Sequence, residues 1–332
     1  MKSTYFRAAV IVLAMQMGTA IASPLPQLNI DKSQTTVSGV SSGGYMAVQL
    51  HVAYSATFNK GAGVIAGGPY NCAEGSALNA VVRCFGRAAI PVAELVKTTN
   101  EWAKSGLIDP TTNLAASKVY LFSGAKDSVV SQSTSSELST YYQSYMAATN
   151  IIYKKDVDAE HAIVTDDYGA ACLSKAAPFI NNCNFDTAGA MLQHLYGSLA
   201  PRSKDASNGA LIEFDQTPFV TAHGMAATGW AYIPKACASG TTCRLHVALH
   251  GCKQNAADVA QEFVRNAGYN RWADANNIVV LYPQTGKGAV NGCWDWWGYD
   301  DANYAKKSAP QMLAITSMVD ALSRGMPGSA TR

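Results

Sequence analysis

The sequence predicts an α/β fold, a single domain in which helices cover both faces of a mostly parallel central sheet. Two observations support this prediction. Short apolar runs rich in β-branched and aromatic residues alternate with stretches of helical spacing, as strand–helix–strand units require. The first run leads into Gly39-x-Ser41-x-Gly43, the spacing of a nucleophile elbow, which is a sharp turn that exposes a serine between a strand and a helix. In such sheets, functional side chains lie at the carboxyl ends of the strands.

The individual elements follow in the same alternation along the chain. The predicted helices cover residues 44–56, 94–105, 134–148 and 257–276. The predicted strands cover residues 61–66, 118–122, 151–154, 245–249 and 277–282. No linker, low-complexity tract or repeat divides the chain, so we expect one domain over residues 23–332. The polar stretch 201–208 is the only candidate for a boundary within it.

The first 22 residues are predicted to form a secretory signal peptide. A positive start with Lys2 and Arg7 precedes an apolar run at 8–17 and a small-x-small cleavage site at 20–22. The apolar run is too short to anchor the chain, and no later stretch approaches the roughly 18 apolar residues of a spanning helix. We therefore expect an exported protein, secreted or periplasmic, that has no membrane partner.

The charge balance argues against a nucleic-acid partner. The predicted signal peptide holds two of the 25 Lys and Arg residues and none of the 23 Asp and Glu residues. The rest of the chain therefore has 23 charges of each sign and no formal net charge. Tight binding to nucleic acid depends on basic side chains that neutralise phosphates, and this composition supplies no excess of them.

All eight cysteines lie beyond the predicted signal peptide, and an even number in an exported chain predicts disulfides. Six of them form three close pairs along the sequence. We predict the bonds Cys72–Cys84, Cys172–Cys183 and Cys237–Cys243, which leaves Cys252 to pair with Cys293. The alternative is a zinc site, but the sequence has no C-x-x-C pair, so we expect no metal.

Two later strand ends supply the partners that an activated serine needs. Asp127 follows the predicted strand at 118–122, and His161 follows the one at 151–154. The order Ser41, Asp127, His161 is the chain order of the α/β-hydrolase triad. Taken separately, the aspartate could cap a turn and the histidine could be an ordinary loop residue. Their arrival in this order after an elbow favours the joint interpretation.

In that interpretation, His161 accepts the proton of the Ser41 hydroxyl as the serine attacks and later returns a proton to the leaving alcohol. Asp127 orients the imidazole ring and stabilises its charged form. Other acids near the histidine share its strand end or follow it, where a triad acid is not usually supplied. These acids are Asp156, Asp158, Asp166 and Asp167.

A second segment has the form of an oxyanion loop. The predicted strand 245–249 runs into His-Gly-Cys at 250–252. A tetrahedral intermediate needs two backbone N–H donors, one from the residue after the nucleophile, here Ser42, and one from such a loop. In an ordinary α/β hydrolase this unit precedes the nucleophile, whereas here it follows Ser41 by more than 200 residues. We therefore predict a circularly permuted α/β-hydrolase fold. The alternative is a second small domain with a coincidental His-Gly turn.

Three segments together resemble extracellular poly(3-hydroxybutyrate) depolymerases of the type whose lipase box lies near the start of the catalytic domain. The segments are GVSSGGYM at 39–46, LHGCKQN at 249–255 and NGCWDWWG at 291–298. The resemblance covers nearly the whole chain beyond the predicted signal peptide, and it implies a circularly permuted α/β-hydrolase fold.

The resemblance also implies the site. Its triad would be Ser41, Asp127 and His161, with the backbone N–H groups of Ser42 and Cys252 as oxyanion donors. The implied chemistry is that of a serine esterase acting on a polyester or oligoester substrate, without a metal or organic cofactor. We expect the protein to act as a monomer.

Many extracellular members of that family carry a linker and a separate domain that adheres to crystalline polymer. The sequence up to Arg332 has neither, so we expect activity on amorphous polymer or soluble oligomers. Two other functions are consistent with parts of the sequence. A feruloyl or acetyl-xylan esterase would use the same triad and oxyanion loop and would differ only in its pocket. A non-catalytic polymer-binding protein would be expected to lack a triad member, and none is missing.

The aromatic residues Trp294, Trp296 and Trp297 are candidates for substrate binding, because rigid aromatic faces suit a neutral chain of esters. If Cys293 is bonded to Cys252, the three indoles are held close to the oxyanion loop. We expect one or two of them in the core and at least one at the surface of the cleft.

Overall fold

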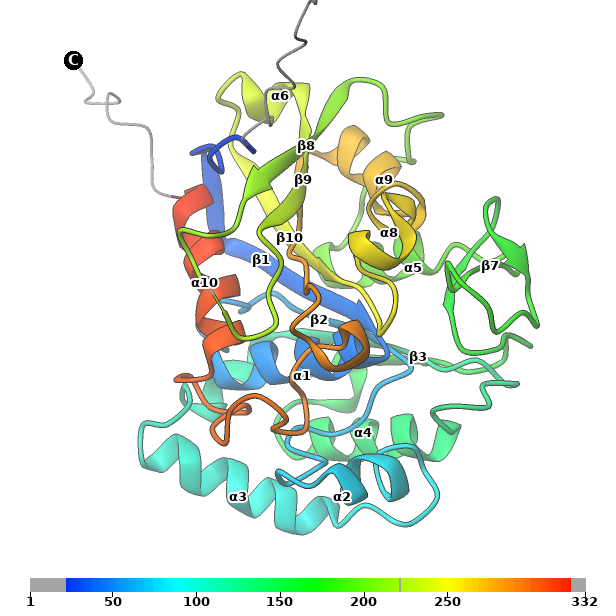
Figure 1. Ribbon diagram of the computed structural model, residues 1–332, viewed down its shortest axis with the longest axis vertical. Coiled ribbons are helices and arrows are strands. Elements are labelled where there is room, and N and C mark those ends of the chain that lie inside the picture. Colours follow the sequence, from blue (N-terminus) through cyan, green and yellow to red (C-terminus); the bar gives the residue numbers. More distant parts are fainter. Residues whose placement is uncertain (1–21, 221, 324–332) are drawn as a thin grey trace, which may run out of the picture.

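The structure is a computed structural model that describes residues 22–220 and 222–323. The predicted signal peptide, residues 1–22, lies outside these ranges except for its last residue. A central eight-stranded sheet is covered by helices, and a small three-stranded sheet projects to one side, at the right of Figure 1. None of the helices in the described ranges combines the length and the apolar character that crossing a bilayer requires.

The central sheet has the strand order β4-β3-β2-β1-β10-β11-β9-β8. The six strands from β4 to β11 are parallel, whereas β9 is antiparallel to β11 and β8 is antiparallel to β9. The bounds are β1 Ile30–Val40, β2 Gly61–Ile65, β3 Lys118–Phe122, β4 Ile151–Lys154, β8 Gly209–Asp215, β9 Thr228–Pro234, β10 Cys243–Leu249 and β11 Ile278–Tyr282. The small sheet has the order β5-β7-β6, with β5 Ile163–Thr165, β6 Ala170–Ala171 and β7 Ile180–Asn182.

Helices cover both faces of the central sheet, as predicted. Helices α1, α3, α4 and α10 contribute to one buried cluster, and α5, α8 and α9 contribute to the other. The bounds are α1 Ser42–Ala53, α2 Ala77–Val82, α3 Val92–Lys104, α4 Gln132–Gln143, α5 Thr187–Tyr196, α6 Lys235–Ala238, α7 Ala256–Val259, α8 Glu262–Asn266, α9 Tyr269–Asn276 and α10 Pro310–Ser323. Three 3₁₀ turns lie at Thr111–Ala116, Ala148–Asn150 and Val290–Gly292.

The two cores are separated by the sheet, because successive side chains of a strand point to opposite faces. In β10, Leu245, Val247 and Leu249 belong to the cluster beneath α1 and α10, whereas Ala248 belongs to the cluster beneath α5 and α9. Apolar side chains are therefore buried on both faces. This is why the parallel strands read as nearly continuous apolar runs in the sequence.

The predicted permutation is confirmed by the position of β10. This strand pairs in parallel with β1, with Gly39 opposite Leu249, and β2 pairs with the other edge of β1. The two strands that flank β1 thus come from distant parts of the chain. Strands β8 to β11 belong to the same sheet as β1, so the alternative of a separate small domain is wrong, and the stretch 201–208 does not separate two sheets.

Two predicted helices were wrong in extent. The stretch 257–276 forms the three short helices α7, α8 and α9 instead of one. The chain breaks at Ala260 and Gly268, whose φ angles of 52° and 93° are incompatible with a right-handed helix. The helix predicted at 134–148 begins at 132 and ends at Gln143, because the chain must turn before it enters β4.

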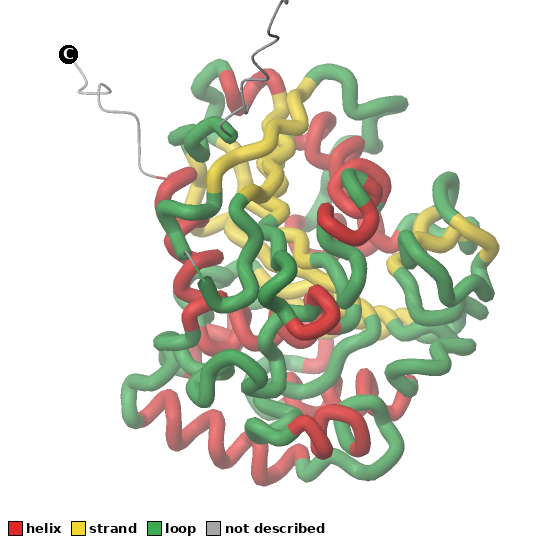
Figure 2. Tube along the Cα trace, viewed as in Figure 1, coloured by secondary structure: helices red, strands yellow, loops and turns green. Residues whose placement is uncertain are grey.

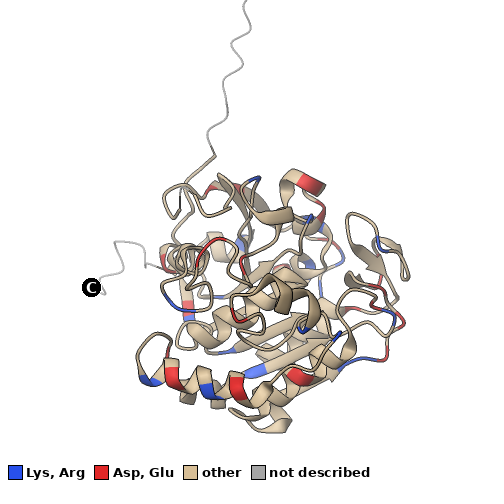
Figure 3. Ribbon diagram, turned by 60° about the horizontal axis from the view of Figure 1, so that its bottom comes forward, with Lys and Arg blue, Asp and Glu red and all other residues tan. Residues whose placement is uncertain are grey.

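Long loops carry much of the structure beyond the strand ends. The segment between β11 and α10 contains a single 3₁₀ turn and is otherwise loop, as Figure 2 shows. Figure 3 shows acidic and basic residues interspersed, for example along α3. This distribution agrees with the absence of a formal net charge beyond the predicted signal peptide.

Three histidines are buried in the core and make hydrogen bonds there. His246 in β10 contacts the hydroxyls of Thr36 and Ser38 in β1, each at 2.7 Å, and so links the two strands that the permutation brings together. His51 in α1 contacts Tyr142 and Ser117. Burial lowers the pKa of His51 and His246 to about 3, and that of His250, which follows β10, to about 4.

These histidines should make the protein acid-labile. They are neutral in the folded state and protonate near pH 6.5 once unfolded, so the unfolded chain binds more protons between about pH 6.5 and 4. The free energy of unfolding must then fall as the pH is lowered through this window, by up to about 1.4 kcal/mol per pH unit for each histidine. Denaturant titrations from pH 7 to 4.5 would measure the slope. The same titrations on a folded His51→Gln variant should give a shallower slope, and an equal slope would contradict the assignment.

Candidate active site

Ser41 occupies the turn between β1 and α1. Its φ of 56° and ψ of −122° are unusual for a residue other than glycine, and this strained conformation is the one expected of a nucleophile elbow. The Ser41 N–H donates to the carbonyl of Ile65 at the end of β2, 2.9 Å away. The turn is therefore fixed to the neighbouring strand, and α1 begins at the next residue.

The glycines of the elbow are required by close approaches of the backbone. A Cβ atom on Gly39 would lie 2.2 Å from the carbonyl oxygen of Gly43. One on Gly43 would lie 2.4 Å from the carbonyl oxygens of both Leu249 and His250, at the end of β10. The first turn of α1 is thus packed directly against the backbone that leads into the predicted oxyanion loop.

The structure brings the three predicted triad residues together. The Nε2 atom of His161 lies 2.9 Å from the Ser41 Oγ, and its Nδ1 atom lies 2.8 Å from the Asp127 Oδ2. The other carboxylate oxygen of Asp127 accepts the N–H groups of Val129 and Val130, at 2.8 and 2.9 Å. The Asp127 side chain is 2% exposed and that of His161 is 12% exposed, so only the serine end of this chain of hydrogen bonds faces outward.

The rival acids have other partners or none within the described residues. Asp156 pairs with Lys154 at 2.8 Å, and Asp166 pairs with Arg202 at 2.6 Å. Asp167 contacts Arg271, and Asp158 is exposed without a side-chain hydrogen bond in this part of the chain. Asp127 is therefore the acid whose carboxylate meets the ring of His161.

Glu160, which lies directly before the histidine, is not among the site residues predicted from the sequence. One of its carboxylate oxygens, Oε1, accepts the N–H of His161 and the N–H of Ser128, both at 2.8 Å. Burial raises the pKa of Glu160, but these two N–H donors, the Ser128 hydroxyl and nearby Lys175 outweigh it, so the pKa lies below its ordinary value. A carboxylate next to the histidine in sequence was the only signal available, and such pairs are common on surfaces.

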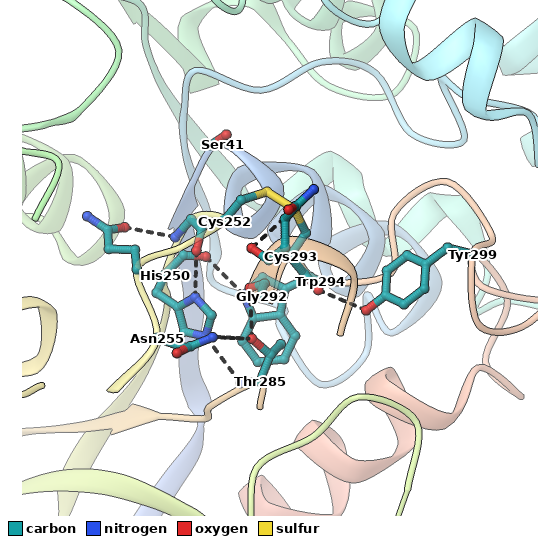
Figure 4. The surroundings of a disulfide bond; sticks show 12 residues. Ser41, His250, Cys252, Asn255, Thr285, Gly292, Cys293, Trp294 and Tyr299 are labelled. Carbon is teal, nitrogen blue, oxygen red and sulfur yellow. Dashed lines mark hydrogen bonds between the residues drawn. A yellow bond between two sulfur atoms is a disulfide. The ribbon is translucent and has the colours of Figure 1, made fainter. Parts of the chain in front are cut away.

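The predicted oxyanion loop lies against Ser41. A Cβ atom on Gly251 would lie 3.4 Å from the Ser41 Cβ, and Cys252 follows directly. The Gly251 N–H is bound by the side chain of Gln254 at 2.8 Å. Neither the Ser42 N–H nor the Cys252 N–H donates to a protein acceptor in the described ranges. Figure 4 shows Ser41 next to Cys252 and the disulfide.

A buried network beneath the loop fixes its conformation. The Nε2 atom of His250 accepts the N–H of Thr285 at 3.2 Å, so the proton of the ring lies on Nδ1, which donates to the Gly251 carbonyl at 2.7 Å. The Trp294 indole N–H donates to the His250 carbonyl at 2.9 Å. These contacts are drawn in Figure 4. Since burial lowers the pKa of His250 to about 4, the ring keeps this neutral form over the ordinary pH range.

The eight cysteines form the four predicted disulfides in the structure. The bond between Cys252 and Cys293 connects the predicted oxyanion loop to the loop that follows β11. The Lys253 N–H also donates to the Asn291 carbonyl at 2.9 Å. The two loops are therefore joined by a covalent bond and by a hydrogen bond.

Of the three predicted tryptophans, two lie in the core and one is partly exposed, which agrees with the expectation of one or two in the core. Trp294 is fully buried and supports His250, so it is not available to a substrate. Trp296 is 4% exposed and stacks on Tyr45 of α1, with ring centroids 4.1 Å apart. Trp297, which packs edge-on against Trp296, is partly exposed. Spacing could not separate the three, because in a loop neither a strand nor a helix period determines which side chain points inward.

The loop that carries Trp297 is shaped by Asp295. The carboxylate of this buried residue accepts the N–H groups of Gly298 and Tyr299 through Oδ1, and those of Asp300 and Asp301 through Oδ2, at 2.8 to 3.3 Å. The backbone of residues 298–301 thus curls around one side chain. This side chain helps to hold the partly exposed indole of Trp297 in a segment without helix or strand.

The fold and this geometry together define an α/β hydrolase of the serine class. A family model described as Esterase PHB depolymerase matches residues 229–325. A poly(3-hydroxybutyrate) depolymerase of Delftia acidovorans is 61% identical over 337 residues, covering 99% of this chain and 68% of that protein. A polyhydroxybutyrate depolymerase of Talaromyces funiculosus is 37% identical over 334 residues, covering 96% of this chain and 97% of that protein.

A solved structure agrees with these sequence relatives. It is a PHB depolymerase with a serine-to-alanine substitution, complexed with an R3HB trimer. Its TM-score is 0.85 at 37% identity, over 91% of this chain and 99% of that chain. The chain therefore belongs to the PHB depolymerase family of carboxylic-ester hydrolases.

Loss of the Cys252–Cys293 bond should lower turnover as well as stability. The chain-entropy model gives a disulfide that spans 41 positions about 4 kcal/mol of stabilisation. The bond also fixes a loop beside Ser41, where a displacement of about 1 Å can cost 10²-fold in rate. The Cys252→Ala/Cys293→Ala variant should therefore melt at a lower temperature and show a lower kcat on a small soluble ester. A matched Cys237→Ala/Cys243→Ala variant should lose stability without a comparable fall in kcat, and equal losses of kcat would contradict the interpretation.

Proposed function

We propose that this chain is an exported serine esterase that hydrolyses the ester bonds of poly(3-hydroxybutyrate), related polyhydroxyalkanoates and their oligomers. The observation that carries the proposal is the chain of hydrogen bonds from Ser41 through His161 to Asp127, at 2.9 and 2.8 Å. Ser41 lies on the nucleophile elbow, and the chain belongs to the PHB depolymerase family. The names of the relatives direct the choice of substrate, since an α/β fold by itself supports many chemistries.

The geometry suits a two-step acyl transfer. His161 Nε2 takes the proton as the Ser41 Oγ attacks the ester carbonyl, and the protonated ring then gives a proton to the leaving hydroxyl group. Water repeats the sequence on the acyl-enzyme and releases the acid. Asp127 holds the proton of His161 on Nδ1, which keeps Nε2 free to act as the base.

The negative charge of the tetrahedral intermediate would be met by the N–H groups of Ser42 and Cys252. The Ser42 N–H lies in the first turn of α1, where the helix presents unpaired donors and the positive end of its dipole. Preorganised donors of this kind are worth roughly 10²–10³ in kcat each. The fixed ring of His250 and the disulfide would keep the Cys252 donor in place.

Substrate binding would depend on apolar contact rather than on charge. A polyester chain is neutral, so aromatic and aliphatic surfaces beside the nucleophile suit it better than an ionic pocket. Trp297 is the partly exposed aromatic residue of the predicted set. A hollow of about 460 Å³ also lies next to the predicted oxyanion loop; its lining includes Phe179, Lys253, Asn291 and Gly292. This hollow could hold part of an extended chain.

The four disulfides support export, because such bonds form and persist in oxidising compartments. Residues 1–22 would be the signal peptide and residues 23–332 the catalytic domain. Hydrolysis of polymer granules outside the cell would require secretion, whereas hydrolysis of soluble oligomers could take place in the periplasm.

The direct test compares substrates on purified protein. Amorphous poly(3-hydroxybutyrate) should yield hydroxyacid monomers and short oligomers, and feruloylated xylan should yield no ferulate. A serine-directed phosphonate should label Ser41, and Ser41→Ala should abolish turnover while keeping the melting temperature. Release of ferulate without hydroxybutyrate would contradict the proposal and indicate a carbohydrate esterase instead. Full activity of Ser41→Ala would rule out the mechanism.

Asp127→Asn should leave the fold intact and slow turnover by about 10⁴-fold, as the equivalent change does in another triad enzyme, because the imidazole is left in the wrong tautomer. Steady-state kinetics on a soluble ester would measure the loss. Asp156→Asn serves as the control, since Asp156 pairs with Lys154 and not with His161. A large loss in Asp156→Asn with a small one in Asp127→Asn would reverse the assignment of the acid.

A further inference from the structure

Glu160 lies between the two loops that carry the acid and the histidine of the proposed triad. The loop after β3 holds Asp127 and Ser128, and the loop after β4 holds Glu160 and His161. The Ser128 and His161 N–H groups converge on the single atom Glu160 Oε1, each at 2.8 Å. This one oxygen therefore fixes the distance between the backbone of Ser128, which follows Asp127, and the backbone of His161.

Glu160 is itself held in place from two sides. Its N–H donates to the Cys172 carbonyl at 3.0 Å, and Cys172 is bonded to Cys183 at the small sheet. On the other side, the Lys175 ammonium group donates to the Ser128 hydroxyl at 2.8 Å, which places a positive charge near the carboxylate. The small sheet, which projects from the body in Figure 1, thus supports the carboxylate that joins the two loops.

We propose that Glu160 is a positioning residue, which sets the orientation of His161 relative to Asp127 and Ser41 through its two backbone hydrogen bonds. The inference rests on the proposed serine esterase function. Without this acceptor, two neighbouring N–H groups lose their partner and the histidine loop can shift. The hydrogen bonds from His161 to Ser41 and to Asp127 would then lengthen, although no residue of the triad has changed.

Two substitutions separate this geometric role from an effect of charge. Glu160→Gln keeps a side-chain oxygen at the same reach and removes the charge, whereas Glu160→Asp keeps the charge and shortens the reach by one methylene. A geometric role predicts that Gln retains kcat on p-nitrophenyl butyrate within about threefold. It also predicts that Asp loses about tenfold to a hundredfold in kcat, the scale expected for a displaced catalytic group, with little change in KM.

The control measurements separate an effect on the geometry of the site from a loss of folding. Asp158→Asn removes a negative charge from the same loop, where the side chain is exposed and makes no hydrogen bond within the described residues, so kcat should be unchanged. Melting temperatures show whether each variant is folded, and the rate of phosphonate labelling of Ser41 reports the geometry of the triad without substrate binding. Labelling should slow in Glu160→Asp in parallel with kcat.

Several outcomes would overturn the proposal. A Gln variant as slow as the Asp variant would mean that the charge matters instead. Normal kcat in both, or a lowered melting temperature with normal kcat and labelling, would leave Glu160 with a structural role alone. Ser41→Ala, measured alongside, keeps this question apart from the proposed function. If Ser41→Ala is inactive, failure of the Glu160 prediction concerns positioning only.

Discussion

The contact between the first turn of α1 and the end of β10 is the constraint on which the site depends. The chain has no room for a Cβ atom at Gly43, where the carbonyl oxygens of Leu249 and His250 approach to 2.4 Å of its position. This close packing places Gly251 beside Ser41, and Cys252 is the next residue along the chain. The proposed oxyanion site therefore depends on two backbones that meet without intervening side chains.

Around this contact, the loops of the site keep their shape through carboxylates instead of regular secondary structure. Asp127 accepts two backbone N–H groups, Glu160 accepts two, and Asp295 accepts four. A backbone N–H in a partly buried loop needs an acceptor, and an ionised side chain provides a strong one. The same arrangement appears in the loop of Asp127 after β3, in the loop of Glu160 and His161 after β4, and in the loop of Asp295 after β11. A carboxylate thus helps to fix the backbone in each of the three loops.

Much of this arrangement could be predicted from the sequence because it depends on local patterns. The elbow has a fixed spacing of glycines, and parallel strands carry their ends to one edge of the sheet, so Ser41, Asp127 and His161 had to converge if the strands were adjacent. The circular permutation followed from the position of the His-Gly segment. The disulfides followed from proximity along the chain for three pairs and from elimination for the fourth.

The remaining features depend on contacts that spacing does not encode. Ala260 breaks the helix predicted at 257–276 through a positive φ angle, although alanine is the best helix former, so tertiary packing must override its preference. Trp294 and Trp297 are three positions apart in one loop, and only the fold determines that the first is buried. Glu160 could not be found because its two partners are backbone groups, one of them 32 positions away, and backbone donors leave no trace in a sequence.

The permuted order of the strands also determines when each part of the site comes into existence. The chain is synthesised from its N-terminus, so β1 and its neighbour β2 appear early, followed by the acid and histidine of the proposed triad. The other edge of β1 has no partner until residues 243–249 arrive. Until then, β1, which is buried in the final sheet, has one unpaired edge. Unpaired N–H and C=O groups at such an edge can pair with other strands. The strand that covers this edge of β1 is also the one that leads into Gly251 and Cys252, so the pairing that covers the edge also brings the proposed oxyanion loop to Ser41.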